Sequence, residues 1–550
     1  MSDAAVLDIS LAEVHEAIGR SRPDAECLVF RDRRLTWAEV EDRTRRLANH
    51  LLDAGHGCHT EREDLEGHES GQDHLAIYLH NGNEYLEVML GTLKARVGSL
   101  NVNYRYVAEE LRYLLTDSAA TAVVVHSAFA PTLAEVLPDL PGVRTVLQVA
   151  DDSGNELLPG AIWYEDALAA ASPARPDATW SADDLYLLYT GGTTGMPKGV
   201  MWRNGDAMRA CFGGSPTATT VEEFVAEATT GLKALIGPPF MHGAGHWIAF
   251  RTWLGGGTVF VPSVPDRLDP DDVWTMIERE RLDFLLIVGD AFARPLLDEL
   301  DRSANQRDLS SLSVMLSGGA ALSAPLKDEL LAHLPTLMVI DGLGSSEAGG
   351  QVSHVSAGGA ASTGTFEMTE GNVVLSGDMD AVLAPGDDEM GWLAKKGRLA
   401  LGYLGDPDKT ARTYPVVQGV RYAVPGDRAR LLDDGAGGLG VVELHGRDSV
   451  TINSGGEKIF AEEVEAALKA HPSIYDCVVA GRPSERWGSE VVAVVRIREG
   501  YEPTDQDLLG EAERHVARYK LPKAIIRVDE IVRSPSGKAD YRWARSVATA

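Results

Sequence analysis

The chain has 550 residues, which exceeds the usual size of a single folding domain. Its 51 lysines and arginines stand against 82 aspartates and glutamates, giving a formal net charge of −31. A chain this acidic repels phosphate backbones and anionic lipids over most of its surface, which argues against a general nucleic-acid or membrane-surface binder. Four widely spaced cysteines without a CxxC pair argue against a disulfide framework or a zinc knuckle.

The start of the chain, MSDAAVLDIS, lacks the basic head and apolar run of a signal peptide. The longest apolar stretches are far shorter than the roughly 20 residues that a membrane-spanning helix needs. Together with the cysteine usage, these features predict a cytoplasmic protein without a membrane span.

Strand-like and helix-like segments alternate in the N-terminal part. Residues 27–30, 75–81 and 121–127 read as apolar strands, and residues 35–55, 83–96 and 107–118 read as helices. Thr36 and Glu39 have the spacing of a capping box at the start of the first helix. The polar stretch 56–74 reads as a surface loop. This alternation predicts an α/β architecture with largely parallel sheets.

A change in composition near residues 435–447 predicts a domain boundary. Beyond it, residues 460–472 and 507–520 read as helices, and residues 474–481, 490–499 and 523–532 read as strands. The sequence therefore predicts a large domain followed by a compact α/β unit of about 100 residues.

The most informative segment is an apolar strand, residues 185–189, that runs into YTGGTTGMPKG. Glycines let backbone N–H groups turn toward an anion, hydroxyls add donors, and one lysine supplies a positive charge. The segment is not a Walker A motif, because Gly199 follows Lys198 where that motif requires Ser or Thr. The pattern favours a lid over a nucleotide polyphosphate.

This loop, with five further motifs in the same order, resembles the adenylate-forming superfamily, which contains acyl-CoA synthetases, adenylation domains and beetle luciferases. The further motifs are PPFMHGAGHW, SGGAALS with DGLGSSEAG, YAVPGD, GRDSVTINSGGEKIFAEEVE and SPSGKADY. The resemblance covers nearly the whole chain. It implies a reaction in which a carboxylate and ATP give an acyl-adenylate and pyrophosphate, after which the CoA thiol takes the acyl group and AMP leaves.

The resemblance also implies the residues that would bind the substrates. The implied ATP and AMP site consists of Thr190, Gly191, Gly192, Thr193, Lys198, Gly318, Gly319, Ala320, Asp341, Gly342, Ser346, Asp427 and Arg447. The implied acyl pocket contains Phe240, His242, Gly243 and Gly344, and His246 could pair with His242 on a helix. The implied CoA tunnel is lined by Ser454, Gly455, Gly456 and Lys458.

Four residues are implied to act in catalysis. Glu347 and the hydroxyl of Thr194 would hold a Mg²⁺ ion, because a hard cation prefers oxygen ligands. Lys538 would reach the α-phosphate and the carboxylate during adenylation and stabilise charge in the transition state. His242 would lie beside the acyl pocket. The expected cofactors and substrates are thus ATP, Mg²⁺, CoA and a carboxylic acid.

The family's fold implies a large N-terminal domain of several subdomains with parallel-rich sheets, residues 1–446, and a small mobile α/β domain, residues 450–550. Residues 447–449 would be the hinge between them, and many relatives carry Asp or Lys where this chain has Ser449. CoA phosphates would need local cations on this acidic protein, and the candidates are Arg482, Arg486, Lys520 and Lys523.

The chain most resembles actinobacterial synthetases for bulky acids, so the expected substrate is a large apolar acid that is long-chain, branched or polycyclic. Two other functions stay open. One is a relative that runs a single half-reaction, either adenylation for a carrier protein or thioesterification of a supplied adenylate. The other is a binding protein that keeps the fold. A homodimer is a candidate assembly, and no nucleic-acid partner is expected.

Overall fold

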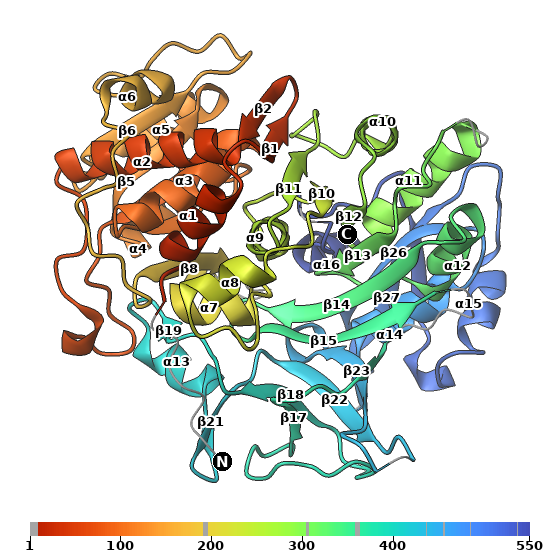
Figure 1. The fold of residues 1–550 in the computed structure, drawn as a ribbon. Coiled ribbons are helices and arrows are strands. Elements are labelled where there is room, and N and C mark those ends of the chain that lie inside the picture. The colour runs from red at the N-terminus through yellow and green to blue at the C-terminus, as the bar shows by residue number, and fades with distance from the viewer. Residues whose placement is uncertain are drawn as a thin grey trace. The chain divides into compact units, whose positions relative to one another are not determined.

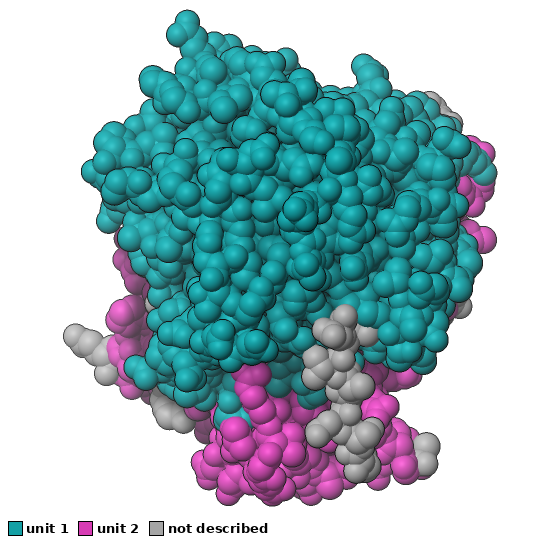
Figure 2. All heavy atoms as spheres, turned by 60° about the vertical axis from the view of Figure 1, so that its left-hand side comes forward, with its two compact units in different colours: residues 1–286, 345–350, 397–415 teal, residues 287–344, 351–396, 416–550 magenta. Residues whose placement is uncertain are grey.

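The computed structural model describes residues 9–190, 196–303, 307–357, 364–435, 437–454, 457–484, 486–535 and 537–550. The chain divides into two compact units, drawn in teal and magenta in Figure 2. Unit 1 comprises Met1–Leu286, Ser345–Gly350 and Gly397–Pro415, and unit 2 comprises Ile287–Gly344, Gln351–Lys396 and Val416–Ala550. Within the described ranges, no helix has both the length and the apolar character needed to cross a membrane.

The first sheet of unit 1 is mainly parallel. Its strands lie in the order β19 (Gly402–Tyr403), β9 (Lys198–Arg203), β8 (Leu185–Thr190), β4 (Gly98–Asn101), β3 (His74–Tyr78), β5 (Ala120–His126), β6 (Thr145–Val149) and β7 (Ile162–Trp163). The pairs from β8 through β4, β3, β5 and β6 to β7 are parallel, whereas β9 and β19 are antiparallel to their neighbours. The predicted parallel α/β arrangement is thus confirmed.

A second set of strands in unit 1 lies in the order β2 (Arg33–Thr36), β1 (Glu26–Phe30), β11 (Thr258–Val261), β10 (Lys233–Ile236) and β12 (Phe284–Ile287). The helices of unit 1 are α1 (Leu11–Ser21), α2 (Trp37–Asp53), α3 (Asn83–Lys94), α4 (Ala108–Asp117), α5 (Ala130–Val136), α6 (Tyr164–Ala170), α7 (Asn204–Ala210), α8 (Val221–Glu227), α9 (Gly243–Leu254), α10 (Pro270–Glu280) and α13 (Pro407–Thr413). Figure 1 shows α1, α2 and α3 packed together in red and orange. The predicted capping box of Thr36 and Glu39 starts α2.

Unit 2 begins with α11 (Gly289–Ser303), β13 (Val314–Gly318), α12 (Ala324–His333) and β14 (Met338–Ser345), in which β13 and β14 are parallel. An antiparallel part follows, formed by β15 (Gly349–Ser356), β16 (Thr365–Glu367), β17 (Asn372–Leu375), β18 (Gly391–Lys396), β20 (Val416–Val417), β21 (Val420–Ala423), β22 (Asp427–Leu432) and β23 (Val441–Arg447). Buried apolar side chains such as Val374, Leu393 and Val442 form its core.

The last part of unit 2 has its own sheet and core. Its strands are β24 (Ile452–Ser454), β25 (Glu457–Ile459), β26 (Ile474–Ser484), β27 (Gly488–Ile497) and β28 (Ala524–Arg527), and its helices are α14 (Ala461–Lys469), α15 (Asp505–Ala512) and α16 (Tyr541–Thr549). The predicted helix 507–520 is wrong at its end. Gly510 weakens the segment as a helix, and the chain turns after Ala512 so that Leu521 joins the core.

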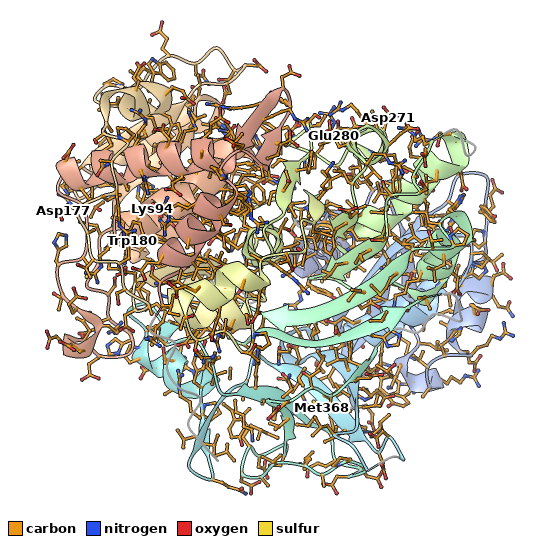
Figure 3. All side chains as sticks on the ribbon, viewed as in Figure 1. Lys94, Asp177, Trp180, Asp271, Glu280 and Met368 are labelled. Carbon is orange, nitrogen blue, oxygen red and sulfur yellow. The ribbon has the colours of Figure 1, made fainter. Side chains whose placement is uncertain are left out.

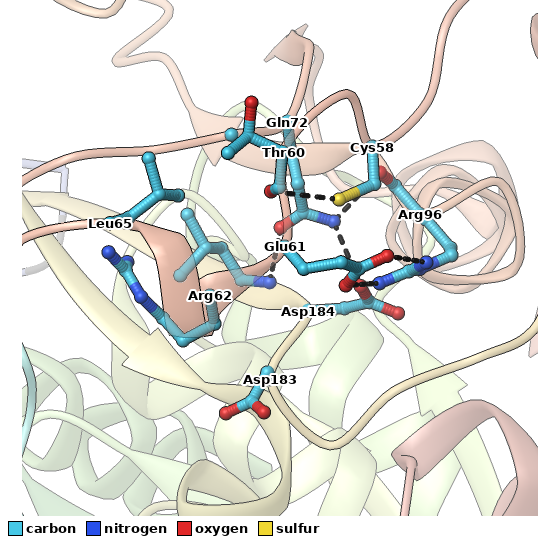
Figure 4. Close-up of a pocket in the computed structure, with 11 residues that line it drawn as sticks. Cys58, Thr60, Glu61, Arg62, Leu65, Gln72, Arg96, Asp183 and Asp184 are labelled. Atoms are coloured by element: carbon cyan, nitrogen blue, oxygen red, sulfur yellow. Dashed lines mark hydrogen bonds and ion pairs between the residues drawn. The ribbon is translucent and has the colours of Figure 1, made fainter.

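The predicted loop 56–74 is tied to the rest of unit 1 by polar contacts. Arg96 is one of the residues that line a small pocket (Figure 4), and its guanidinium contacts Glu61 at 2.7 Å and Asp184 at 2.9 Å. The side-chain amide of Gln72 donates to Asp184 at 3.2 Å. These ion pairs fill the pocket and anchor the loop, which gives it a structural role.

A buried ion pair lies under the helices of unit 1. Lys94, labelled in Figure 3, donates to Thr44 and lies 2.9 Å from a carboxylate oxygen of Glu16, and the side chains of Lys94 and Glu16 are fully buried. Trp180, also labelled in Figure 3, donates from its indole nitrogen to the Lys94 carbonyl at 2.8 Å. Buried charges persist only with such partners, so this pair fixes the packing of α1, α2 and α3.

Three buried histidines predict that acid destabilises the fold. Burial lowers the pKa of His15 to about 3 and the pKa of His126 and His246 to about 4. Below the ordinary pKa near 6.5 the unfolded chain binds protons that the folded chain excludes. Each histidine therefore removes about 1.4 kcal/mol of stability per pH unit as the pH falls from that value toward its folded pKa.

Urea unfolding at pH 7.5, 6.5 and 5.5 measures this loss, and His15→Leu isolates one contribution. The His15 ring lies between the rings of Trp37 and Trp253, and within the described part of the chain neither of its nitrogens has a hydrogen-bond partner. Leucine should keep the apolar packing and reduce the pH dependence by about 1.4 kcal/mol per pH unit. An unchanged pH dependence would contradict the assignment.

Candidate functional site

The Gly/Thr loop joins two antiparallel strands of unit 1. Thr190 ends β8 and pairs in register with Lys198, which begins β9. The Lys198 ammonium donates to the Asp117 carboxylate at 2.9 Å, and this hydrogen bond raises the pKa of Lys198. The Tyr189 hydroxyl donates to the other oxygen of Asp117 at 3.0 Å. Asp117, which the sequence motif does not include, therefore orients the lysine of the loop.

Some predicted site residues lie outside the described residues. They are Gly191, Gly192, Thr193 and Thr194 of the Gly/Thr loop, and Gly455 and Gly456 of the CoA segment. Their roles stay predictions.

Glu347 lies in unit 1 within a set of polar and aromatic side chains. Its Oε1 accepts a hydrogen bond from the Tyr403 hydroxyl at 2.7 Å, and its carbonyl accepts one from Tyr414 at 3.3 Å. The Lys409 ammonium lies 4.0 Å from the centre of the Tyr403 ring. Burial lowers the pKa of Lys409, and the Glu347 carboxylate opposes that shift. The carbonyl of the neighbouring Ser346 accepts from Trp202 at 2.8 Å, which fixes the backbone beside Glu347.

The predicted acyl segment leads into α9. Phe240 is completely buried, and its ring centre lies 5.5 Å from that of Tyr85. His242 is the residue before Gly243, the first residue of α9. A Cβ on Gly243 would lie 3.1 Å from Leu188 and from Trp247, so only glycine fits there without displacing a neighbour.

The predicted pairing of His246 with His242 is wrong. One ring nitrogen of His246, Nδ1, donates to the Phe240 carbonyl at 2.7 Å, and the other accepts from the Tyr186 hydroxyl. Both nitrogens are therefore used in unit 1's core, and burial keeps this imidazole neutral by lowering its pKa to about 4.

In unit 2, β13 and β14 bring the two predicted nucleotide loops together. Gly318 lies opposite Gly342, and Ser317 lies opposite Asp341. The Asp341 carboxylate pairs with the buried ammonium of Lys327, so its side chain serves the scaffold. Ala320 follows these strands, and Gly344 lies near the end of β14.

Lys538 lies next to the same loop of unit 2. Gly319 has a positive φ of 91°, and a Cβ placed on it would stand 3.4 Å from the Lys538 Cε atom. Glycine therefore gives the backbone its left-handed conformation, and the lysine stem lies within contact distance of this residue. The turn that presents Lys538 is closed by a hydrogen bond from the Ser534 amide to the Lys538 carbonyl at 2.9 Å. Two predicted site segments that are far apart in the sequence thus meet.

Asp427 and Arg447 lie opposite each other on β22 and β23 of unit 2. The Arg447 Nε atom donates to Asp427 at 3.2 Å, and the aspartate side chain is only 10% exposed. Arg447 leads into the short 3₁₀ turn Asp448–Val450, the predicted hinge, which includes Ser449. The arginine orients the carboxylate that is predicted to accept hydrogen bonds from ribose.

The predicted CoA residues lie in the last part of unit 2. Ser454 ends β24, and Lys458, on β25, is 61% exposed with its ammonium 3.9 Å from Asp448. Arg482 is paired with Glu490 and Lys520 with Glu463, which offsets their charge. Arg486 lies over the Trp487 ring, and Lys523 is exposed. Arg486 and Lys523 are therefore the better candidates for CoA phosphates.

Sequence reasoning missed Asp117, Tyr403 and Lys409. Asp117 and Tyr403 each contact a predicted residue from a segment more than 50 residues away, and Lys409 lies over the ring of Tyr403. The segment GYLGDPDK shows an aromatic and a basic residue close together, but this spacing does not reveal that Tyr403 donates to the Glu347 carboxylate.

Comparison with known proteins places the chain in a family. Residues 15–374 match the model of the AMP-binding enzyme family, and residues 463–538 match the model of the AMP-binding enzyme C-terminal domain. The chain is 51% identical to the medium-chain acyl-CoA ligase Mig of Mycobacterium avium over 100% of both chains. It is 39% identical to the 3-oxocholest-4-en-26-oate–CoA ligase of Rhodococcus rhodochrous, over 95% of this chain and 93% of the relative.

Solved structures show the same fold. The anthranilate CoA ligase AuaEII in complex with anthranoyl-AMP superimposes with a TM-score of 0.81 at 21% identity, covering 99% of this chain and 98% of that one. ATP-bound MatB from Rhodopseudomonas palustris gives a TM-score of 0.78 at 23% identity, with 98% and 99% covered. From its motifs, its fold and these relatives, the chain belongs to the AMP-binding, adenylate-forming enzymes.

Proposed function

We propose that the protein is an ATP-dependent, AMP-forming acyl-CoA ligase for medium- and long-chain fatty acids and for acids of sterol side chains. The observation that carries this proposal is the position of Lys538 beside Gly319 of the nucleotide loop. Relatives that share 51% and 39% of their residues with this chain are named as ligases of medium-chain acids and of 3-oxocholest-4-en-26-oate. Both acids are apolar, in agreement with the substrate class predicted from the sequence.

In the first step a carboxylate oxygen of the acid bonds to the α-phosphorus of ATP, and pyrophosphate leaves. Both reactants are anions, so positive groups must offset their repulsion. Lys198 would neutralise the β- and γ-phosphates, and Lys538 would neutralise the α-phosphate and the incoming carboxylate. Asp427, with only acceptor atoms, would receive the hydroxyl groups of ribose.

In the second step the CoA sulfur attacks the acyl carbon, and the bond from this carbon to the AMP oxygen breaks. We propose that residues 450–550 move about the hinge 447–449 between the steps, so that Lys538 withdraws and the segment 454–458 lines the path of the thiol. A homodimer and a cytoplasmic location stay predictions that gel filtration and cell fractionation test.

The donor set fits a Mg²⁺ ion carried by ATP. In the parts of the chain that the structure describes, no cluster of three or more His, Cys, Asp or Glu side chains could hold a metal ion. Mg²⁺ commonly takes one or two protein carboxylates and completes its shell with phosphate oxygens and water. Glu347, with Thr194, would hold the ion, which supplies charge neutralisation at the phosphates.

Tyr403→Phe tests how Glu347 is oriented. The Tyr403 hydroxyl donates to the Glu347 carboxylate at 2.7 Å, so its loss leaves that carboxylate less well oriented for the ion. A hydrogen bond to a charged group is worth enough to raise the Mg²⁺ concentration for half-maximal rate by about tenfold. Tyr414→Phe is the matched control, because the Tyr414 hydroxyl donates to the backbone carbonyl of Glu347 rather than to its carboxylate. Equal Mg²⁺ dependence in both variants would contradict the role of Tyr403.

One assay tests the proposed function. The protein is incubated with ATP, Mg²⁺ and octanoate, palmitate, benzoate or 3-oxocholest-4-en-26-oate, with and without CoA, and pyrophosphate and thioester are measured separately. We expect both products with the fatty and sterol acids. Pyrophosphate without thioester would indicate adenylation for another acceptor, and thioester only from supplied adenylate would indicate the second step alone. If no acid gave either product, the result would favour a binding protein that keeps the fold.

A further inference from the structure

A chain of ionic contacts within unit 2 begins at Asp290, the second residue of α11. The Asp290 Oδ1 atom accepts a hydrogen bond from the Ser323 amide at 2.7 Å, and the Asp290 amide donates to the Ala321 carbonyl at 3.1 Å. Both partners belong to the loop 317–323 that carries Gly319. Asp290 is therefore fixed to the loop that is predicted to hold adenine.

The other oxygen of Asp290 contacts the last part of the chain. The Lys469 ammonium, at the end of α14, donates to Oδ2 of Asp290 at 3.2 Å and lies 3.5 Å from Asp476 on β26. The side chains of Lys469, Asp290 and Asp476 are 16%, 11% and 15% exposed. Burial alone would lower the pKa of Lys469, but the two aspartates hold it above its usual value. Lys469 is thus a largely buried ammonium shared by two carboxylates.

The contacts continue to the turn that presents Lys538. Arg533 donates to both oxygens of Asp476, at 2.7 and 2.6 Å. The Arg533 guanidinium also donates to the carbonyl of Gly537, the residue before Lys538, at 2.9 Å. The ion chain Asp290–Lys469–Asp476–Arg533 therefore connects the loop 317–323 to the turn that bears Lys538. Lys538 in turn lies beside Gly319 of the same loop.

The place of the ion chain in the sequence shows which motion it opposes. Asp290 belongs to the predicted large domain, whereas Lys469, Asp476 and Arg533 belong to the predicted mobile domain. Among the contacts described for this ion chain, Lys469–Asp290 is the one that joins the two predicted domains, so a rotation about residues 447–449 has to break it. A second contact, from the Tyr475 hydroxyl to Asp298 at 3.0 Å, also joins β26 to α11 (Figure 1).

We propose that Asp290 is a positioning residue for adenylation, which holds residues 450–550 through Lys469 so that Lys538 stays beside the nucleotide loop. This inference rests on the proposed function. Removing the negative charge of Asp290 should slow the first step, which uses this arrangement, and should spare the second step, which requires the arrangement to open. A purely structural role would affect both steps alike.

Asp290→Asn is the first test. Asparagine has the same shape and keeps an oxygen for the Ser323 amide, but it loses the charge that holds Lys469. The rate of acid-dependent exchange between pyrophosphate and ATP should fall by about tenfold or more, because loss of one partner of a largely buried charge pair weakens the arrangement that contains it by at least that factor. The rate of thioester formation from supplied acyl-adenylate and CoA should stay within about twofold of the wild type.

Glu329→Gln is the matched control. Glu329 pairs with Arg294 of α11 at 2.7 Å, and the contacts described for it do not involve residues 450–550. Both half-reactions of this variant should match those of the wild type. Unfolding in urea checks that Asp290→Asn is folded.

Lys469→Gln and the double variant keep the inference testable if Asp290→Asn is unstable. Lys469→Gln should slow adenylation selectively, and the double variant should be no slower than the slower single variant, because both changes break the same Lys469–Asp290 contact. Equal loss of both half-reactions, no loss of either, or additive effects would overturn the inference. If the wild-type protein formed adenylate but no thioester, the proposed ligase function would be refuted. The role of Asp290 in adenylation could still be tested by the exchange between pyrophosphate and ATP.

Discussion

Lys538→Ala should lose acyl-adenylate formation and keep thioester formation from supplied acyl-adenylate. The lysine stem lies beside Gly319, and the turn that bears it is closed by Ser534. Its ammonium would stabilise charge that develops as the carboxylate approaches the α-phosphate. Removal of one such preorganised donor typically lowers the rate by a hundredfold to a thousandfold, so we expect exchange between pyrophosphate and ATP to fall by about a thousandfold.

Lys396→Ala is the control for a general loss of charge. Lys396 is an exposed lysine of β18 in the same unit, and the hydrogen bond described for it uses only its backbone. Both half-reactions of this variant should be unchanged. If Lys538→Ala reduced the two half-reactions equally, the assignment of Lys538 to the first step would be wrong.

Glu347→Gln should remove most of the Mg²⁺-dependent activity. Glutamine has the shape of glutamate and can still accept the Tyr403 hydrogen bond, so the local structure should persist. It lacks the negative charge that a hard cation requires. We expect formation of pyrophosphate to fall by about a hundredfold, the lower end of the range for loss of one electrostatic contribution to the transition state.

The Mg²⁺ titration separates a role in metal binding from a role in folding. Added Mg²⁺ should recover part of the activity of Glu347→Gln, whereas the unfolding midpoint in urea should be unchanged. Glu222→Gln, at an exposed glutamate of α8, is the matched control and should behave as the wild type. Full activity of Glu347→Gln at low Mg²⁺ would contradict the metal role.

Local patterns predicted much of the fold. The capping box at Thr36 and the strand that ends at Thr190 are confirmed, because each depends on hydrogen bonds or burial within a few residues. The prediction that the helix continues to residue 520 was wrong. The helix ends at Ala512, because the tertiary packing of Leu521 overrides a weak local preference for helix. Boundaries of short elements depend on such long-range contacts.

The candidate site was predicted through motifs, but the partners of its residues were not. Asp117 orients Lys198, and Tyr403 orients Glu347, from segments that no spacing in the sequence connects to the motifs. For His246 the sequence spacing was misleading. This histidine lies one helical turn from His242, but both of its ring nitrogens form hydrogen bonds within the core. The role of a side chain depends on which distant segments of the chain pack against it, and only the structure shows which segments these are.

Transfer of ¹⁸O from the acid to AMP tests the central claim most directly. An acid labelled in both carboxyl oxygens is incubated with the protein, ATP, Mg²⁺ and CoA, and the AMP is examined by mass spectrometry. If the carboxylate bonds to the α-phosphorus and the thiol later breaks the acyl–oxygen bond, each AMP carries one ¹⁸O atom. Thioester formed with unlabelled AMP, or with ADP and labelled phosphate, would contradict an acyl-adenylate.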